Sequence, residues 1–150
     1  MIRKLLATSI IALSVSATAS AAEWVHVADV DASTILLDHS SIAAAGKFQS
    51  VQVLRNYDRL INLGSDPDTK ELWYPHRSVQ LSYLADCGAK KVALDAWQMH
   101  SGNFGNGDVV WADRFAGAPA FVVPSSSEES AALDNACAKT AALSLVSFAN

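Results

Sequence analysis

Residues 78–87, with the sequence SVQLSYLADC, combine a strand pattern with one of the cysteines of the chain. Side chains alternate along the segment, so one side holds Val79, Leu81, Tyr83 and Ala85. Alternation with a period of two predicts a β-strand whose two faces meet different surroundings. The segment ends at Cys87, one of only 2 cysteines in the chain, so a covalent link can join this strand to a distant element.

Similar alternation predicts further strands on both sides of this segment. Residues 48–58 alternate best, with Val51 and Val53 facing one way and Gln52 facing the other. Weaker patterns predict strands at residues 23–30, 34–38, 91–100 and 108–115, and a short apolar run at residues 120–123. Alternating segments separated by turn residues are typical of an antiparallel sheet.

The connections between these strands differ in composition. Residues 39–46 contain paired serines and end in Gly46, which favours a short helical turn or a loop. Residues 59–75 are rich in Asn, Gly, Asp and Pro and predict a long hairpin connection. The glycine-rich residues 101–107 precede a predicted strand and lack a Lys-Ser or Lys-Thr pair, so they indicate a hairpin turn and not a phosphate-binding loop.

The pattern becomes helical after Pro124. Ser125 and Ser126 each stand three residues before a glutamate, a spacing typical of the capping box that begins a helix. The apolar stripe of this helix consists of Leu133, Ala136, Cys137 and Thr140. We therefore predict an α+β fold, with a single antiparallel β-sheet of about six strands and a C-terminal α-helix packed on one face.

The first 21 residues have the pattern of an export signal. Arg3 and Lys4 precede an apolar run at residues 5–13, and the sequence Ala-Ser-Ala at residues 19–21 fits a cleavage site. The run is too short for a membrane anchor, which needs about 20 apolar residues. We expect a signal peptide at 1–21, one domain at 22–150 with no transmembrane segment, and a periplasmic, secreted or cell-surface product. No cysteine near the junction could accept a lipid, so we expect no lipid anchor.

Cys87 and Cys137 are the 2 cysteines, and they lie 50 positions apart. In an oxidising compartment an isolated pair in a small domain predicts a structural disulfide. No histidine stands at zinc-ligand spacing from either cysteine, and a catalytic cysteine would need a reduced environment and a partner base. A disulfide that closes a loop of this length contributes about 4 kcal/mol in the chain-entropy model.

The charge balance excludes one class of partner. The chain has 11 Lys and Arg against 15 Asp and Glu, for a net charge of −4, and loss of Arg3 and Lys4 with the signal would leave −6. Nucleic-acid binding needs clustered basic residues, and no such cluster is evident. We therefore expect no nucleic-acid partner.

The four histidines give no local motif. His26, His39, His76 and His100 are widely spaced, and none forms an H-x-H, H-x-x-H or H-E-x-x-H pattern. We predict no metal site, no cofactor and no catalytic residue from the sequence. A metal or haem site that assembles in space, or across a dimer, stays open.

One aromatic segment falls outside the predicted strands. Trp73 and Tyr74 lie in the long connection close to Arg77. Exposed aromatic residues beside an arginine have the composition of a protein-binding hot spot. The alternative is that both rings fold back onto the sheet as part of the core. We take Trp73, Tyr74 and Arg77 as candidate contact residues of a binding surface.

Several of these features occur in a recognisable order. They are the strand VQVLRNY at 51–57, the strand end Tyr83-x-x-Asp86-Cys87, the sequence DVVW at 108–111, and VPS at 123–125 before the helix that carries Cys137. Over roughly residues 24–138 this order resembles the surface-adhesin protein E family of bacterial envelope proteins. Within the pattern, the tyrosine–aspartate–cysteine strand end coupled to a helical cysteine is the most specific part.

The resemblance implies an antiparallel sheet packed on a C-terminal helix, a disulfide between them, and a homodimer. It also implies a non-enzymatic surface protein that binds host matrix or plasma proteins, or haem. Three features differ from the family pattern. The lipidated cysteine of the founding adhesin is missing, and Phe121 stands where a tryptophan is expected before the Pro-Ser helix start. In addition, no basic patch is evident that would bind an acidic host protein.

Two other functions are compatible with the sequence. One is a small periplasmic enzyme that uses Asp and His in a cleft, and the other is a structural envelope protein without a known ligand. The enzyme hypothesis predicts that histidines and carboxylates converge within hydrogen-bonding distance in the folded chain.

Overall fold

The computed structural model describes residues 22–117, 121–122 and 127–147 of the 150-residue chain. The strands are β1 (Trp24–Val30), β2 (Ser33–Ala45), β3 (Phe48–Ile61), β4 (Gly64–Ser65), β5 (Leu72–Trp73), β6 (His76–Asp86), β7 (Lys91–His100), β8 (Val109–Arg114) and β9 (Phe121–Val122). A short 3₁₀ turn, η1 (Asn103–Gly105), precedes β8, and one helix, α1 (Glu128–Ser147), ends the fold. The predicted signal at 1–21 lies outside the described residues.

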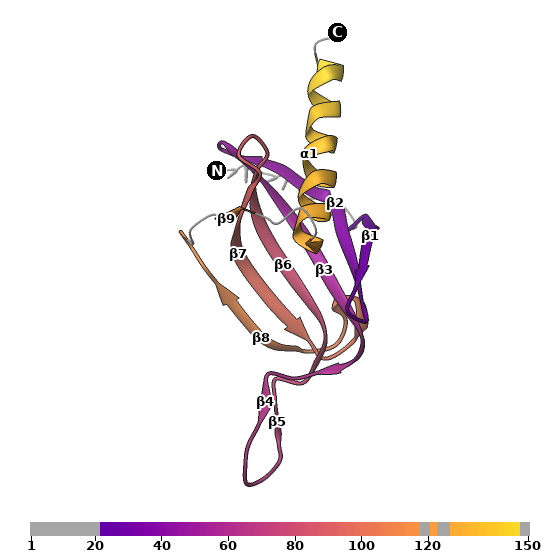
Figure 1. Cartoon of the computed structure of the whole chain (residues 1–150), viewed down its shortest axis with the longest axis vertical. Helices are drawn as coiled ribbons and strands as arrows, with labels where there is room; N and C mark the ends of the chain where they lie inside the picture. The colour runs from indigo at the N-terminus through magenta and orange to yellow at the C-terminus, as the bar shows by residue number, and fades with distance from the viewer. Residues whose placement is uncertain (1–21, 118–120, 123–126, 148–150) are drawn as a thin grey trace, which may run out of the picture.

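Six strands form one antiparallel sheet in the order β1-β2-β3-β6-β7-β8, and β9 adds a short pairing to β7. Neighbouring strands are therefore mostly neighbours in sequence, and the one long connection, between β3 and β6, contains the separate β4–β5 hairpin. Figure 1 shows this hairpin projecting from one end of the sheet while α1 lies at the other end. The predicted α+β class and the strand number are confirmed.

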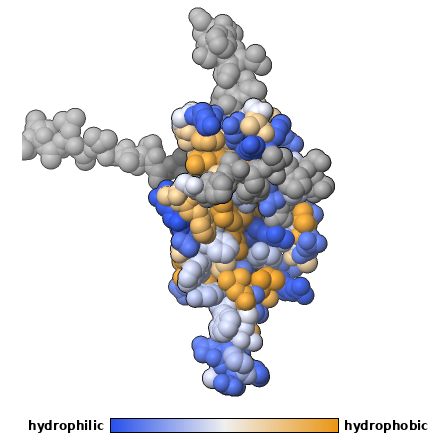
Figure 2. All heavy atoms as spheres, turned by 60° about the vertical axis from the view of Figure 1, so that its left-hand side comes forward, coloured by the Kyte–Doolittle hydropathy of each residue, from blue (hydrophilic) through white to orange (hydrophobic). Residues whose placement is uncertain are grey.

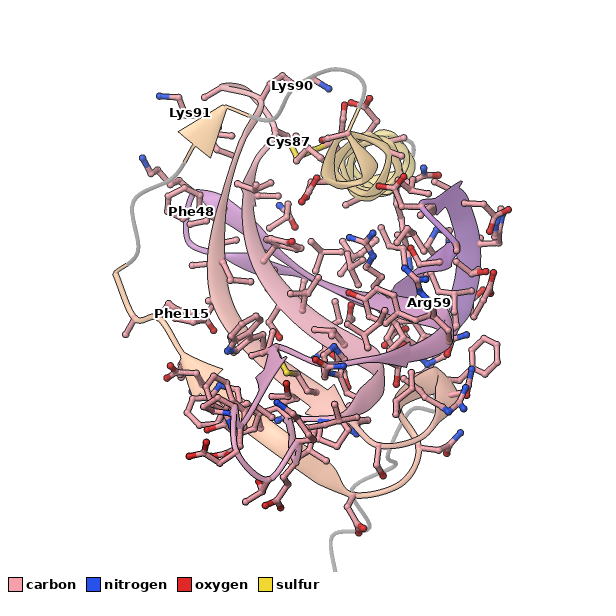
Figure 3. All side chains as sticks on the ribbon, turned by 60° about the horizontal axis from the view of Figure 1, so that its bottom comes forward. Phe48, Arg59, Cys87, Lys90, Lys91 and Phe115 are labelled. Atoms are coloured by element: carbon pink, nitrogen blue, oxygen red, sulfur yellow. A yellow bond between two sulfur atoms is a disulfide. The ribbon has the colours of Figure 1, made fainter. Side chains whose placement is uncertain are left out.

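The register aligns the predicted apolar faces into continuous rows. Val53 pairs with Leu81, and Leu81 pairs with Trp97, so the row crosses β3, β6 and β7 on one face. Seven buried residues of this face form the sheet side of the core: Ile35, Leu37, Val51, Val53, Tyr83, Ala85 and Val92. The sheet curls around this face, which is concave and filled with side chains (Figure 3).

Helix α1 covers part of the concave face. Leu133 and Ala136 from its first turns are buried in the core, as the predicted stripe requires. Cys137 forms a disulfide with Cys87 at the end of β6, which confirms the predicted covalent link between sheet and helix. Figure 3 looks nearly along the helix and shows Cys87 beside it, and Figure 1 shows α1 extending past the end of the sheet.

The start of α1 lies directly after the serines of the predicted capping boxes. Ser125 and Ser126 lie outside the described residues, and α1 begins at Glu128. The hydroxyl of Ser127 accepts a hydrogen bond from the Ser130 N–H at 3.2 Å, so Ser127 caps the helix.

Residues 39–46 were expected to form a helical turn or a loop, and this prediction is wrong. Strand β2 continues to Ala45, with a register shift between Asp38 and Ala43. Within this bulge the Ser41 hydroxyl accepts a hydrogen bond from the Gln52 N–H at 2.9 Å and donates one to the Asp38 carbonyl at 2.7 Å. The serine side chain thus satisfies backbone groups that the bulge would otherwise leave unpaired.

The predicted turn after β7 packs against the face of the sheet opposite α1. The Phe104 N–H donates to Asn56 Oδ1 at 2.7 Å, and the Gly105 N–H donates to Ser78 Oγ at 2.9 Å. Ser78 Oγ in turn donates to the Gly102 carbonyl at 2.7 Å. Asn56 and Ser78 are paired neighbours on the face away from α1, and both are buried. The loop therefore covers polar side chains that would otherwise face water.

Candidate binding surface

In the β4–β5 hairpin, the indole ring of Trp73 lies against the backbone of Gly64. Gly64 pairs with Trp73, and the Leu63 N–H donates to the Trp73 carbonyl at 3.0 Å. A Cβ atom added at Gly64 would lie 2.9 Å from Cε3 of the indole, and Gly64 has a φ of +151° that disfavours other residues. The glycine is thus required both for the backbone and for the position of the ring.

Tyr74 is held next to this hairpin by its backbone and its ring. Its φ of 51° is in the left-handed region, and its carbonyl accepts a hydrogen bond from Nδ1 of the buried His76 at 2.7 Å. Because a carbonyl only accepts, Nδ1 must carry the proton. The Tyr74 ring packs edge-to-face on Trp111 of β8, with centroids 4.7 Å apart and an interplanar angle of 65°.

These rings remain exposed in the folded chain. Trp73 is 49% exposed, Tyr74 is 38% exposed and Trp111 is 37% exposed, and Leu72 beside them is exposed as well. We call Leu72, Trp73, Tyr74 and Trp111 the hairpin surface. Figure 2 shows strongly apolar side chains gathered next to the hairpin, whose tip is hydrophilic. The alternative in which Trp73 and Tyr74 fold back into the core is therefore not what the structure shows.

The other sequence candidate, Arg77, lies half-buried at the start of β6, three residues after Tyr74. Trp111 was missed at the sequence level because an aromatic residue within a strand is usually part of a core. Trp111 is exposed because β8 is an edge strand, with β7 as its neighbour in the strand order. The sequence does not show the strand order, so it gave no signal for this position.

The tip of the hairpin is an acidic turn. Asp66 Oδ1 accepts hydrogen bonds from the N–H groups of Asp68 and Thr69 at 2.9 and 2.8 Å. The bonds from Thr69 and Asp68 hold the pKa of Asp66 below its ordinary value. Asp68 and Glu71 are also exposed here, so the hairpin surface adjoins a negatively charged tip.

The histidines do not assemble a site with carboxylates. His26 and Asp29 form a pair at 3.0 Å, but both side chains are more than half exposed on β1. His76 bonds to a backbone carbonyl, and both ring nitrogens of His100 are buried without a partner among the described residues. In the part of the chain that the structure describes, no three His, Cys, Asp or Glu side chains form a metal-binding group.

No helix within the described ranges is long and apolar enough to cross a bilayer. No curated protein matches the chain in sequence. A solved structure of Haemophilus influenzae protein E superposes with a TM-score of 0.55 at 13% identity, covering 77% of this chain and 84% of that chain. A second crystal form of that protein gives a TM-score of 0.51 at 14% identity, with 70% and 80% covered.

At these identities the superpositions show the shared fold, namely a curved antiparallel sheet with a C-terminal helix. The sequence itself provides the stronger link, because the model of the family described as surface-adhesin protein E matches residues 24–138. That range contains the whole sheet and both disulfide cysteines. A surface-adhesin family implies an exported protein of the cell surface. This chain belongs to the surface-adhesin protein E family.

Proposed function

We propose that this chain is an exported, non-enzymatic adhesin-like protein that binds a host matrix or plasma protein through the hairpin surface. The single observation that carries the proposal is the exposure of three rings, namely Trp73 on the projecting hairpin and Tyr74 packed on Trp111 of β8. Tryptophan and tyrosine are enriched among residues that dominate binding energy at protein interfaces. Family membership supports the adhesin assignment.

The rings of the hairpin surface are already held in place in the folded chain. Trp73 rests on Gly64, and Tyr74 is fixed by the His76 contact and by Trp111. Rings that are already ordered lose little conformational entropy on binding, so more of the contact energy appears as affinity. Exposed apolar surface of this kind is unusual on a soluble protein unless a partner covers it.

The charge of the hairpin suggests the kind of partner. Asp66, Asp68 and Glu71 surround the tip, with Lys70 as the basic residue between them. A partner with an apolar pocket for the rings and a basic rim would match both features. Complementary charge mainly accelerates association, so we expect the association rate to fall as salt concentration rises.

A haem ligand does not fit the described side chains as well. Of the four histidines, His76 lines a groove of about 310 Å³ on the concave face. His76 is buried, and its Nδ1 is already engaged by the Tyr74 carbonyl. We therefore assign no haem-binding residue.

The proposal includes processing of the N-terminus. We infer that residues 1–21 are removed on export and that the mature chain carries no lipid, as the Ala-Ser-Ala sequence and the absence of a nearby cysteine suggest. N-terminal sequencing and intact mass of the exported protein test this. A retained N-terminus or an added lipid mass would contradict it.

Binding to immobilised matrix and plasma proteins tests the main proposal. We expect Trp73→Ala to weaken binding about thirtyfold or more, because a hot-spot residue contributes about 2 kcal/mol or more. Tyr74→Asn is the second variant, since asparagine tolerates the left-handed backbone at this position. Phe104→Ala, at an exposed aromatic residue in η1, is the matched control and should bind normally.

Three results would contradict the proposal. One is the absence of binding to every protein tested, and another is unchanged binding by the Trp73 and Tyr74 variants. The third is an equal loss in the Phe104 control, which would indicate general apolar stickiness. The rival structural role predicts the first of these results, and an enzyme would show turnover instead of stable capture.

A further inference from the structure

Strand β8 forms an open edge of the sheet, on the side away from β1 (Figure 1). It pairs with β7 on one side, and no described strand pairs with it on the other. The short strand β9 pairs with the opposite end of β7, at Lys91 and Val92. Trp111 of the hairpin surface lies on β8, so this open edge is continuous with the exposed rings. The other edge strand, β1, contacts α1 and contributes nothing to the hairpin surface.

The backbone groups of Ala112 point away from the sheet. Successive residues of an antiparallel strand direct their N–H and C=O groups alternately toward and away from the neighbouring strand. The Phe115 N–H donates to the Asp95 carbonyl of β7 at 2.7 Å, so Phe115 faces β7, and by alternation Asp113 does too. Ala112 and Arg114 therefore carry outward N–H and C=O groups.

A carboxylate already occupies the outward donor at the end of this edge. The Arg114 N–H donates to Asp113 Oδ1 at 2.7 Å, and charged side chains at an edge usually hinder the addition of a strand. Among the described residues, no side chain bonds to the outward groups of Ala112. Ala112 also borders an open hollow of about 530 Å³, whose lining includes the small side chain of Ala96. The edge therefore has free backbone groups and space for another chain at Ala112.

We propose that β8 binds an extended segment of the host protein, which adds as an antiparallel strand centred on Ala112. This inference rests on the proposed function for the source of the segment. Donor and acceptor groups that alternate along a strand edge are matched by the backbone of another extended chain, and strand addition is a recurrent mode of peptide recognition. The exposed rings beside the edge add side-chain contacts to this backbone pairing.

The side chains of β8 define the residues that suit the segment. Trp111 and Asp113 flank Ala112 and share one face of the sheet. In an antiparallel arrangement, the partner residue opposite Asp113 precedes the central residue, and the one opposite Trp111 follows it. A basic side chain suits the exposed Asp113 carboxylate, and an aromatic one suits the rings of Trp111 and Tyr74. The favoured segment therefore has a basic residue two positions before an aromatic one.

A synthetic heptapeptide, Thr-Thr-Lys-Val-Trp-Thr-Lys with both ends blocked, is the probe for this edge. Its valine would lie opposite Ala112, its lysine opposite Asp113 and its tryptophan opposite Trp111. Titration calorimetry on the exported, disulfide-bonded protein should show saturable binding. The Ala112 amide should exchange more slowly with solvent deuterium in the complex, because that N–H gains an acceptor.

The matched control is the same peptide with an N-methylated valine. It keeps every side chain but lacks the N–H that would donate to the Ala112 carbonyl. We expect it to bind about tenfold more weakly than the unmodified peptide. Equal binding of the two peptides would overturn the proposal.

Two substitutions at Ala112 separate its backbone from its side chain. Ala112→Pro removes the outward N–H but no bond to β7, and proline is tolerated on edge strands where its nitrogen faces solvent. We expect it to bind the heptapeptide about tenfold more weakly, whereas Ala112→Ser keeps the N–H and should bind normally. Far-UV circular dichroism checks the fold of both variants. If the proline variant does not fold, the N-methylated peptide and the exchange of the Ala112 amide decide the question.

Three further results would overturn the proposal. One is the absence of saturable heptapeptide binding up to about 1 mM, which corresponds to about 4 kcal/mol. Another is unchanged binding by a folded Ala112→Pro variant. The third is a dimer of the protein alone that Ala112→Pro converts to a monomer without any peptide binding, because a second copy would then occupy β8.

Failure of this inference and failure of the proposed function give different results. If Trp73→Ala weakens capture of a host protein and a folded Ala112→Pro variant does not, the hairpin surface stands and strand addition is wrong. If the heptapeptide binds at Ala112 but no host protein is captured, the open edge is supported as a peptide site and the adhesin proposal is contradicted.

Discussion

Buried polar residues show at the smallest scale how this sheet departs from an apolar core. His100 at the end of β7 is 7% exposed, and neither of its ring nitrogens has a partner among the described residues. Burial lowers the pKa of His100 below its ordinary value of 6.5, because the charged ring is poorly solvated there. The residue is therefore a source of instability that acid makes worse.

We expect His100→Leu to stabilise the fold by about 1 kcal/mol, because it removes buried groups that lack hydrogen bonds. Since the folded pKa lies below the unfolded one, the native protein should lose stability as pH falls below 6.5, and the variant should lose less. Urea unfolding at pH 7.5 and pH 5.5 measures both effects. A destabilised variant, or an identical pH dependence, would contradict this account.

Ser78 is the opposite case, because its buried hydroxyl both donates and accepts a hydrogen bond. Its hydroxyl donates to the Gly102 carbonyl and accepts from the Gly105 N–H. We expect Ser78→Ala to cost about 1–3 kcal/mol, because the Gly102 carbonyl and the Gly105 N–H, both half-buried, would lose this partner. Ser82→Ala, on the same strand but half-buried, is the control and should cost less. Denaturant unfolding compares the two, and equal losses would argue against the loop contact.

At the scale of elements, periodicity predicted strands better than connections. Strands with strong alternation, such as β3 and β6, matched their predicted positions within a few residues. The extension of β2 to Ala45 could not be predicted, because Ser41 acts through a hydrogen bond to Gln52 on the next strand. A local pattern cannot show that a hydroxyl will replace a backbone partner on another strand.

The hairpin is the element that we expect to be dispensable for folding. It projects from the sheet (Figure 1), and Leu63, Leu72 and Trp73 are exposed along it. Replacing residues 63–73 by a short Gly-Ser linker should change the free energy of unfolding by about 1 kcal/mol or less, since little apolar surface is lost. The same deletion should abolish capture of a host protein. Thermal unfolding and the binding assay separate the two results, and a large stability loss would show that the hairpin supports the sheet.

At the scale of the whole molecule, one covalent bond joins the two layers. The disulfide between Cys87 and Cys137 spans 50 positions. We expect the double variant Cys87→Ala, Cys137→Ala to lose about 4 kcal/mol, because the unfolded chain gains the freedom that the closed loop removed. Unfolding with and without reductant measures this loss. The double variant should be insensitive to reductant, and a native protein equally insensitive would contradict the prediction.

The architecture followed from the sequence more fully than the candidate site did. Alternation predicted the strands, the apolar stripe predicted the helix, and the cysteine pair predicted the bond between them. The hairpin surface depends on Tyr74 meeting Trp111, two residues 37 positions apart on different elements. The concave groove takes its lining from β3, β6, β7 and α1, which only the packed fold brings together. Neither juxtaposition leaves a local pattern in the sequence.

Helix α1 extends past the end of the sheet, and the residues that hold it to the sheet lie toward its start. A helix of 20 residues is about 30 Å long at about 1.5 Å per residue. Its buried residues Leu133 and Ala136 and the bond at Cys137 all lie in the first half, so that half is anchored as firmly as the sheet. Past the bridge, the Lys139 ammonium donates a hydrogen bond to the His39 carbonyl on β2. Backbone amides in this first part of the helix should therefore exchange slowly with solvent deuterium, and reduction of the sulfur bridge should make them exchange faster.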